Sequence, residues 1–99
     1  MKIPKRFKLA GTAIEVHTRR TLRGNVWGRA WLDMNCVEIA THSKGKPRPL
    51  EGPVGVSQTF WHEATHLILS AMGNKLCDDE MFVNRFGKLL AEICETAEF

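Results

Sequence analysis

The chain is short of the features that mark secreted and membrane proteins. It has three cysteines, no tyrosine, and no apolar run of the roughly 18 to 20 residues that a membrane-spanning helix needs. Cys36, Cys77 and Cys94 are odd in number and widely spaced, which excludes complete disulfide pairing and a Cys-x-x-Cys zinc site. The basic start of the chain lacks the apolar stretch of a signal peptide. We therefore expect a cytoplasmic protein with reduced, partly buried thiols and no membrane partner.

Length and charge suit one small domain whose two halves differ in charge. The 99 residues are 43% hydrophobic and 25% charged, which predicts a single domain spanning residues 1–99. Residues 1–50 carry eleven Lys and Arg against three acids, and residues 51–99 carry three against eight, so the halves are +8 and −5 and sum to +3. A basic half attracts nucleic acid or an acidic protein, but within one domain it more often pairs with the acidic half or is solvated. Nucleic acid is therefore the less favoured partner.

The first half of the chain has the patterns of two β-hairpins. Residues 7–18 alternate apolar and polar side chains, as a half-buried strand does, with a turn at Gly11. Residues 26–32 and 36–41 are β-prone, and the turn formers at 33–35 separate them. These runs predict a small antiparallel sheet, with residues 36–41 as its exposed edge.

Two helices follow a basic loop. Residues 41–55 contain three prolines and three glycines, which predicts a long loop, either functional or disordered. Ser57 is expected to cap a largely buried helix over 58–72, which Gly73 and Asn74 terminate. Asp78 or Asp79 is expected to cap a second helix reaching about Ala97. Apolar residues at helical spacing predict its core face, namely Phe82, Val83, Phe86, Leu89, Leu90, Ile93 and Cys94.

The first of these helices contains the motif His62-Glu63-Ala64-Thr65-His66. Histidines four residues apart lie one turn apart on the same face, where both imidazoles reach one tetrahedral cation. Glu63 lies beside them and is the candidate general base for hydrolysis. The apolar surroundings favour Zn²⁺, because burying these groups without partners costs on the order of several kcal/mol. The alternative is a pair of hydrogen-bonded core histidines, with Glu63 on the surface.

A catalytic zinc site needs a third protein ligand, and no histidine follows His66. The ligand is therefore a carboxylate or Cys77, unless His17 or His42 folds back onto the helix. We choose Glu80.

The position of Glu80 at the start of the second helix explains this choice. The short connection 73–78 folds that helix back, which brings its first turn toward His66. Small or short residues recur along the Glu80 stripe and allow the two helices to approach closely, namely Asn84, Gly87 and Ala91. The alternative role for Glu80 is a favourable charge in the first turn of the helix.

The two helical segments also resemble a known family. Residues 60–69 and 79–90 are similar to the His-Glu-x-x-His and Glu-x-x-Ala-Asn-x-Phe-Ala signatures of the ImmA/IrrE-like metallo-endopeptidases, most of all the small phage-type members. Those resemble the chain over nearly its whole length, from a Lys-Ile-Pro-Lys start onward. Val83 and Gly87 stand where the larger family prefers alanine. The resemblance implies one general base and three zinc ligands, in turn Glu63, His62, His66 and Glu80.

The resulting expectation is a minimal zincin-like fold of class α+β, in which the sheet packs on the motif helix and the C-terminal helix closes the zinc site. We expect a zinc metallo-endopeptidase that binds an extended protein or peptide substrate at the sheet edge. The resemblance implies a regulatory protein such as a repressor as the substrate. Trp27, Trp31 and Trp61 are assigned to the core. Without tyrosine, an oxyanion is left to His42, an arginine or the zinc, which predicts weak activity.

Two other functions are compatible with the same residues. The first is a zinc-stabilised binding module that uses the basic half to bind nucleic acid or an acidic protein. A site with four protein ligands favours this alternative, whereas three ligands favour hydrolysis. The second is an inhibitor or adaptor that keeps the fold with feeble activity.

Overall fold

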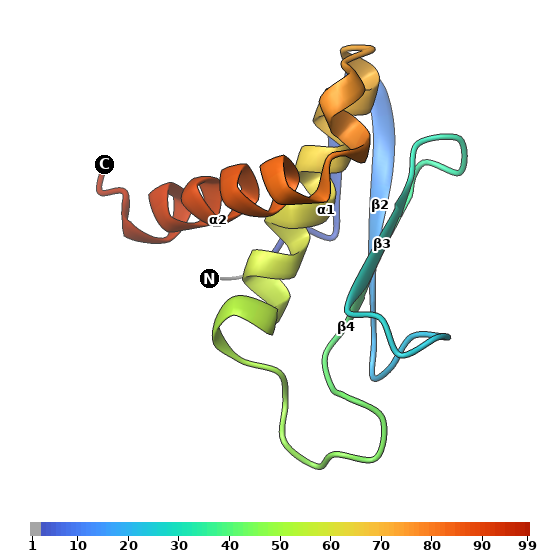
Figure 1. Ribbon diagram of the computed structural model, residues 1–99, viewed down its shortest axis with the longest axis vertical. Helices are drawn as coiled ribbons and strands as arrows, with labels where there is room; N and C mark the ends of the chain where they lie inside the picture. The colour runs from blue at the N-terminus through green and yellow to red at the C-terminus, as the bar shows by residue number, and fades with distance from the viewer. Residues whose placement is uncertain (1–2) are drawn as a thin grey trace.

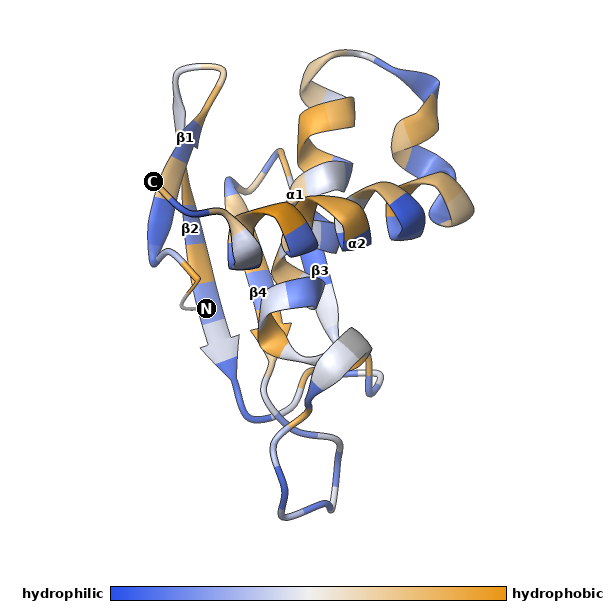
Figure 2. Ribbon diagram, turned by 90° about the vertical axis from the view of Figure 1, so that its left-hand side faces the viewer, coloured by the Kyte–Doolittle hydropathy of each residue, from blue (hydrophilic) through white to orange (hydrophobic). Residues whose placement is uncertain are grey.

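The computed structural model describes residues 3–99 as an α+β fold, as the sequence predicts, with a four-stranded sheet and two long helices (Figure 1). The helix α1 contacts both the sheet and α2, so it is the middle of the fold. In Figure 2, α2 crosses in front of α1 and the sheet lies behind. The elements in chain order are β1 Arg6–Leu9, β2 Thr12–Arg19, β3 Gly28–Trp31, β4 Cys36–Ala40, the 3-10 helix η1 Gly52–Val54, α1 Val56–Ala71, the 3-10 helix η2 Lys75–Asp78 and α2 Glu80–Thr96.

The sheet is mixed, so the prediction of a purely antiparallel sheet is wrong. Both predicted hairpins are present, as β1–β2 and β3–β4. They join through β2 and β4, which run parallel from Glu15 opposite Cys36 to Arg19 opposite Ala40. The strand order is β1-β2-β4-β3. The prediction that residues 36–41 form the sheet edge is therefore also wrong, because β4 lies between β2 and β3. Turn residues determine pairing within a hairpin, but no local signal determines how two hairpins join.

The core lies between the sheet and α1. Buried side chains of β2 and β4 meet those of α1 there, and the cluster consists of Ile14, Val37, Ile39, Phe60, Ala64 and Leu67. Aromatic rings extend it, since Phe60 packs edge-on against Phe7 with ring centroids 5.7 Å apart. The helix carrying the motif is therefore central and largely buried, as the sequence predicts.

The ends of α1 differ in how well the sequence predicts them. The helix begins at Val56 after Gly55, and no side chain caps it. Ser57 is inside the helix, and its hydroxyl is buried without a hydrogen-bond partner among the described residues, so its predicted capping role is wrong. The predicted end is confirmed. Gly73, with φ of 67°, donates its N–H to Ser70 O at 2.9 Å, and Asn74 donates to Leu69 O at 2.9 Å. This is the Schellman arrangement that glycine favours.

The helix α2 packs on α1 through Gly87 and Ala91 of the predicted stripe, whereas Asn84 of that stripe is exposed. Asp79 caps it, because its carboxylate accepts the Phe82 N–H at 3.0 Å. The buried residues of α2 are Val83, Gly87 and Ala91. A Cβ added at Gly87 would lie 3.0 Å from Cα and 3.1 Å from the backbone nitrogen of His62. The two backbones therefore approach closely beside the motif.

The predicted core face of α2 is wrong for three of its residues. Phe86 is 47% exposed, and Leu89 and Ile93 are each 62% exposed. The helix has two apolar stripes, and the one with small residues lies against α1. Close approach of backbones favours small side chains, which helical spacing alone does not reveal.

Residues 41–55 form the predicted loop, whose only regular element is η1. Its two ends are tied by the Leu50 N–H, which donates to Thr41 O at 2.7 Å, and by a bridge between His42 and Pro49. The loop therefore folds back on itself and returns the chain to the start of α1.

The composition led to expectations about the cysteines and about membrane-spanning helices. Cys36, Cys77 and Cys94 are free thiols of intermediate burial, as expected. Within residues 3–99, no helix combines the length and the apolar character that crossing a membrane requires.

Candidate metal centre

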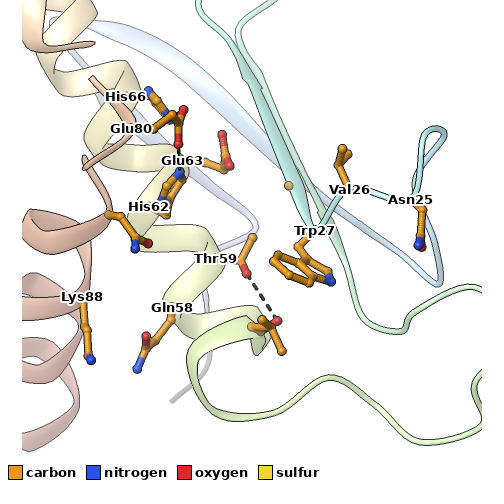
Figure 3. Close-up of a pocket in the computed structure, with 13 residues that line it drawn as sticks. Asn25, Val26, Trp27, Gln58, Thr59, His62, Glu63, His66, Glu80 and Lys88 are labelled. Carbon is orange, nitrogen blue, oxygen red and sulfur yellow. Dashed lines mark hydrogen bonds and ion pairs between the residues drawn. The ribbon is translucent and has the colours of Figure 1, made fainter. Parts of the chain in front are cut away.

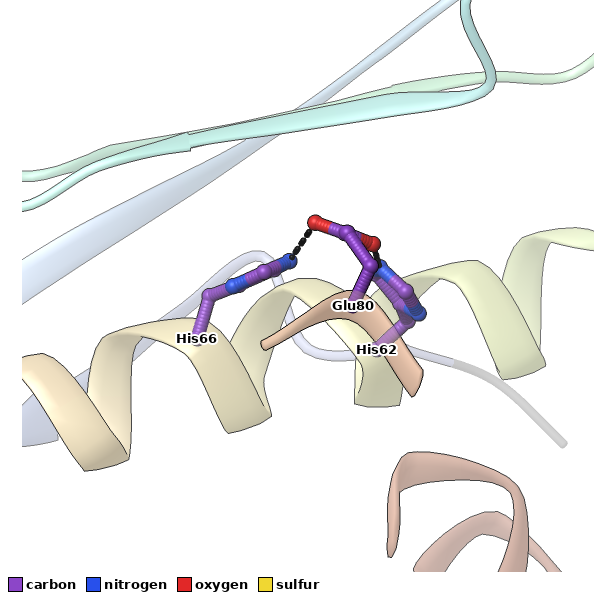
Figure 4. A group of neighbouring side chains, drawn as sticks. All are labelled: His62, His66 and Glu80. Atoms are coloured by element: carbon purple, nitrogen blue, oxygen red, sulfur yellow. Dashed lines mark ion pairs between the residues drawn. The ribbon is translucent and has the colours of Figure 1, made fainter. Parts of the chain in front are cut away.

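The three predicted ligands lie together at the junction of α1 and α2. His62 and His66 project from one face of α1, and Glu80 is the first residue of α2 (Figure 4). Glu80 Oε1 lies 2.9 Å from His66 Nε2, and Glu80 Oε2 lies 3.2 Å from His62 Nε2. One potential ligand atom from each residue fits within a span of 4.8 Å. The chosen carboxylate is therefore the one that meets both histidines.

The connection between the helices accounts for this meeting. After the end of α1, the Asn74 side chain accepts the Leu76 N–H at 2.9 Å and starts η2. Asp79 then caps α2, so Glu80 falls in its first turn, above the histidines. The caps formed by Asn74 and Asp79 thus reverse the chain direction within a few residues. This reversal brings Glu80 back to α1.

A backbone contact orients the ring of His66. Its Nδ1 lies 2.6 Å from the carbonyl oxygen of Cys77. A carbonyl only accepts hydrogen bonds, so Nδ1 carries a hydrogen, and in the neutral ring this leaves the lone pair on Nε2. Histidines that bind metals are typically held in this way through their second nitrogen. Cys77 therefore contributes its backbone to the centre, whereas its thiol does not belong to the donor group.

The donor set fits a zinc ion in chemistry and in spacing. Nitrogen and oxygen ligands at about 2.0–2.2 Å in a tetrahedron stand roughly 3.3–3.6 Å apart. The two Glu80 contacts, at 2.9 and 3.2 Å, are slightly shorter than this, whereas the whole donor group lies within 4.8 Å. A bound cation would therefore require adjustment of both imidazole rings and of Glu80, whose side chain is 71% exposed. Within residues 3–99, no fourth histidine, cysteine or acidic donor joins the group. Three protein ligands leave one coordination position open.

Burial favours the form of His62 that binds metal. Desolvation lowers the pKa of His62, the neighbouring His66 lowers it further, and the Glu80 carboxylate opposes both effects. A lowered pKa keeps the imidazole neutral, which leaves a lone pair for a cation.

Glu63 is buried beside the three ligands. Only 8% of the residue is exposed. Burial raises the pKa of its carboxyl group to about 7, with His66 opposing this shift and Glu80 adding to it. Gly28 of β3 makes room for the carboxyl group, since a Cβ there would lie 3.0 Å from Glu63 Oε2 and 2.6 Å from Thr59 Cγ2. The structure thus places Glu63 between the ligands and the edge of the sheet.

A cleft of about 720 Å³ opens in front of these four residues (Figure 3). The chain before β3 forms one wall, and α1 and α2 form the other. Its lining residues are Asn25, Val26, Trp27, Gly28, Val54, Gln58, Thr59, His62, Glu63, His66, Glu80, Asn84 and Lys88. The cleft therefore combines the donor group with the start of an edge strand.

One sequence-based assignment around the cleft is wrong, and one of the three candidates for oxyanion stabilisation is removed. Trp27 is not a core residue, because it is 48% exposed and lines the cleft. Trp61 packs against the core cluster as expected, whereas Trp31 is only partly buried and is not among the residues packed against that cluster. His42 is not among the described residues that line the cleft. Its Nδ1 lies 2.7 Å from Thr41 Oγ1 instead. His42 is therefore not placed to stabilise an oxyanion.

Sequence reasoning missed five polar residues of the cleft, namely Asn25, Gln58, Thr59, Asn84 and Lys88. A signal existed for two of them. Asn84 and Lys88 follow Glu80 by one and two helical turns, so they continue its stripe along α2. Gln58 had no such signal, since its place depends on where α1 begins.

Comparison with known protein families, with characterised proteins and with solved structures found no match to this chain.

Proposed function

We propose that the protein is a zinc-dependent metallo-endopeptidase that cleaves a regulatory protein. The observation that carries the proposal is the opening of a two-histidine, one-carboxylate donor group into a cleft that also holds the buried Glu63. Three protein ligands with an open position are typical of catalytic zinc, whereas structural zinc has four protein ligands. The resemblance of both helices to ImmA/IrrE-like metallo-endopeptidases supports the same function.

Each residue of the group has a separate role in this proposal. His62, His66 and Glu80 would hold the ion. A bound zinc ion polarises a carbonyl group and makes a water molecule more acidic. Glu63 accepts the proton of the attacking water and delivers it to the departing amine. Burial raises the pKa of its carboxyl group, and a cation held by the neighbouring ligands would lower it again, which favours the carboxylate that accepts the proton.

The substrate is proposed to lie along β3. This strand is at the edge of the sheet, and its first residue lines the cleft. An extended peptide adds to such an edge through backbone hydrogen bonds, with little demand on its side chains. The exposed Val26 and Trp27 offer apolar contacts. Asn84 and Lys88 line the opposite wall and offer the hydrogen-bond donors that a tyrosine supplies in other zinc peptidases.

The test compares Glu63→Gln with the wild type on a panel of peptides and unfolded proteins, both loaded with zinc. The amide keeps size and polarity but cannot accept the proton, so turnover is expected to fall by about 100-fold or more. Zinc content and substrate binding are expected to remain. His62→Ala is the companion variant and is expected to lose metal and turnover together. Equal turnover by wild type and Glu63→Gln would overturn the proposal.

One observation favours a second function, the binding of an acidic macromolecule. The basic loop and the end of β2 lie together, because the His42 N–H donates to Arg20 O at 2.8 Å. Exposed cations of this end are Arg20, Arg23, Lys44, Lys46 and Arg48. Affinity for duplex DNA that falls steeply with salt, and falls less steeply when the three loop cations are replaced by alanine, would support this function.

A further inference from the structure

The outer side of α2 carries an apolar seam that the fold leaves uncovered. We define the seam as Phe82, Phe86, Leu89 and Ile93, which follow one another at spacings of four, three and four residues. Phe82 stacks on Phe86 with ring centroids 5.8 Å apart. The last three are 47%, 62% and 62% exposed. This alternation of three and four is the spacing with which one helix packs along another.

The seam lies away from the packed side of α2. The stripe that contacts α1 contains Gly87, and Leu89 is two residues further, or about 200° round the helix. The cleft residues Asn84 and Lys88 follow Glu80 on a third side of the helix. In Figure 2, α2 is the element nearest the viewer and has apolar segments along its length. A partner on the seam would therefore leave both the helix junction and the cleft free.

Charges beside the seam indicate which partner it takes. Arg85 and Glu92 are both exposed, stand two helical turns apart, and border the same side of the seam. If two copies of α2 pack antiparallel about a two-fold axis, Arg85 of each copy lies near Glu92 of the other. A parallel pair would instead place the two Arg85 side chains on opposite sides of the seam, where neither meets Glu92 of the other copy. The seam is thus complementary to itself in one orientation.

We propose that two copies of the chain associate through antiparallel packing of their α2 helices along this seam. The same surface is then used by both copies, as two-fold symmetry requires. The seam extends over about three helical turns, which is short for a helical interface. The dimer is therefore one that dissociates on dilution, with two clefts open to substrate.

The test is sedimentation equilibrium of the whole chain over a wide range of concentrations, with and without added salt. The wild type is expected to pass from monomer to dimer, and Leu89→Glu is expected to remain a monomer with unchanged helical content by circular dichroism. Each of Arg85→Glu and Glu92→Arg places like charges together, so the dissociation constant is expected to rise about tenfold. The variant with both changes restores opposite charges and is expected to dimerise nearly as well as the wild type.

A matched control separates this geometry from a general effect of charge. Glu95→Arg makes the same change of charge one turn beyond Glu92, on the side of the helix away from the seam, and is expected to leave the dissociation constant unchanged. A wild type that stays monomeric at every concentration would overturn the proposal. So would a double variant that dimerises no better than its single parents.

Discussion

At the scale of single residues, the candidate centre depends on which atoms are free to bind a cation. The Cys77 carbonyl occupies Nδ1 of His66, and Glu80 approaches the Nε2 atoms of both histidines. Glu80 also sits in the first turn of α2, where any acidic residue is favourable. Its role as a ligand therefore has to be separated from its role at the helix end.

Replacement of Glu80 separates these roles when it is compared with replacement of its neighbour. Glu80→Ala removes one of three ligands, so zinc affinity is expected to fall by more than the roughly tenfold to hundredfold that loss of an outer-shell partner costs. Asp79→Ala removes the cap on Phe82 N–H, which costs about 1 kcal/mol of stability. Its zinc affinity is expected to equal that of the wild type, as measured by competition with a chromogenic chelator.

The zinc content of the variants can also contradict the assignment of Glu80. If Asp79→Ala or Cys77→Ser lost the metal while Glu80→Ala retained it, the assignment of the third ligand would be wrong. The histidine pair on α1 would not be affected by that result.

Gly28 leaves the space that the Glu63 and Thr59 side chains occupy, because glycine has no side chain. Alanine there would bring a Cβ to 2.6 Å from Thr59 Cγ2 and 3.0 Å from Glu63 Oε2. Gly28→Ala is therefore expected to displace Glu63 and reduce turnover by about tenfold or more, since catalysis depends on sub-ångström placement. Zinc content should stay at the wild-type level.

The removal of the clashing methyl group provides the control for Gly28. Thr59→Ser deletes Cγ2 and keeps the hydroxyl that donates to Val54 O. Added to Gly28→Ala, it is expected to restore part of the turnover. No recovery in the double variant would indicate that the glycine acts through the strand backbone instead.

At the scale of elements, the sequence predicts both hairpins, the loop and both helices because each has a local signal. Alternation and turn residues indicate strands, and helical spacing with Asp79 and Gly73 indicates helices. The parallel contact of β2 with β4 has no local signal. It forms because α1 buries one face shared by both hairpins, so the predicted edge at 36–41 became a central strand.

Most of the candidate site could be predicted because its residues are close together in the sequence. His62, Glu63 and His66 lie within one helical turn, so spacing alone relates them. Glu80 required the further inference of a tight reversal between helices. The cleft wall at Trp27 was missed, because burial of a tryptophan depends on which strand is the sheet edge, and that depends on the whole topology.

Gly87 connects the packing of the helices to the metal centre. Glycine to alanine inside a helix normally stabilises a protein by about 1 kcal/mol. Here the added Cβ would lie 3.0 to 3.2 Å from the backbone of α1 at Trp61 and His62. Gly87→Ala is therefore expected to reverse that sign, with a loss of about 1–3 kcal/mol in denaturant unfolding. Zinc affinity should fall as well, because α2 moves away from the histidines with Glu80.

Glu95, an exposed residue of α2, provides a control for the effect of a substitution to alanine on stability. Glu95→Ala changes helix propensity without touching α1, and is expected to shift stability by less than about 0.5 kcal/mol. A Gly87→Ala protein that is more stable than the wild type and binds zinc equally well would disprove the close-packing argument.

At the scale of the whole molecule, the centre joins α1 to the first turn of α2, next to the close approach of the two helices at Gly87. The ligands come from α1 and from the first turn of α2, and α2 itself packs on α1 rather than on the sheet. A cation bound there would bridge the middle of the fold to its outer layer. Loss of the cation should therefore loosen α2 before it loosens the sheet.

Zinc is accordingly expected to stabilise the folded chain. Binding to the folded state alone, at free zinc about 100-fold above the dissociation constant, adds about 2.7 kcal/mol. For a domain of this size, that corresponds to a rise of roughly 10 to 20 °C in Tm. Calorimetry with and without a chelator measures the shift, and hydrogen exchange should show the largest change in protection along α2. The His62→Ala variant keeps the same core but lacks one ligand, so its Tm is expected to be the same with and without zinc. An equal rise in both proteins would mean that the cation binds elsewhere, and the candidate centre would have to be abandoned.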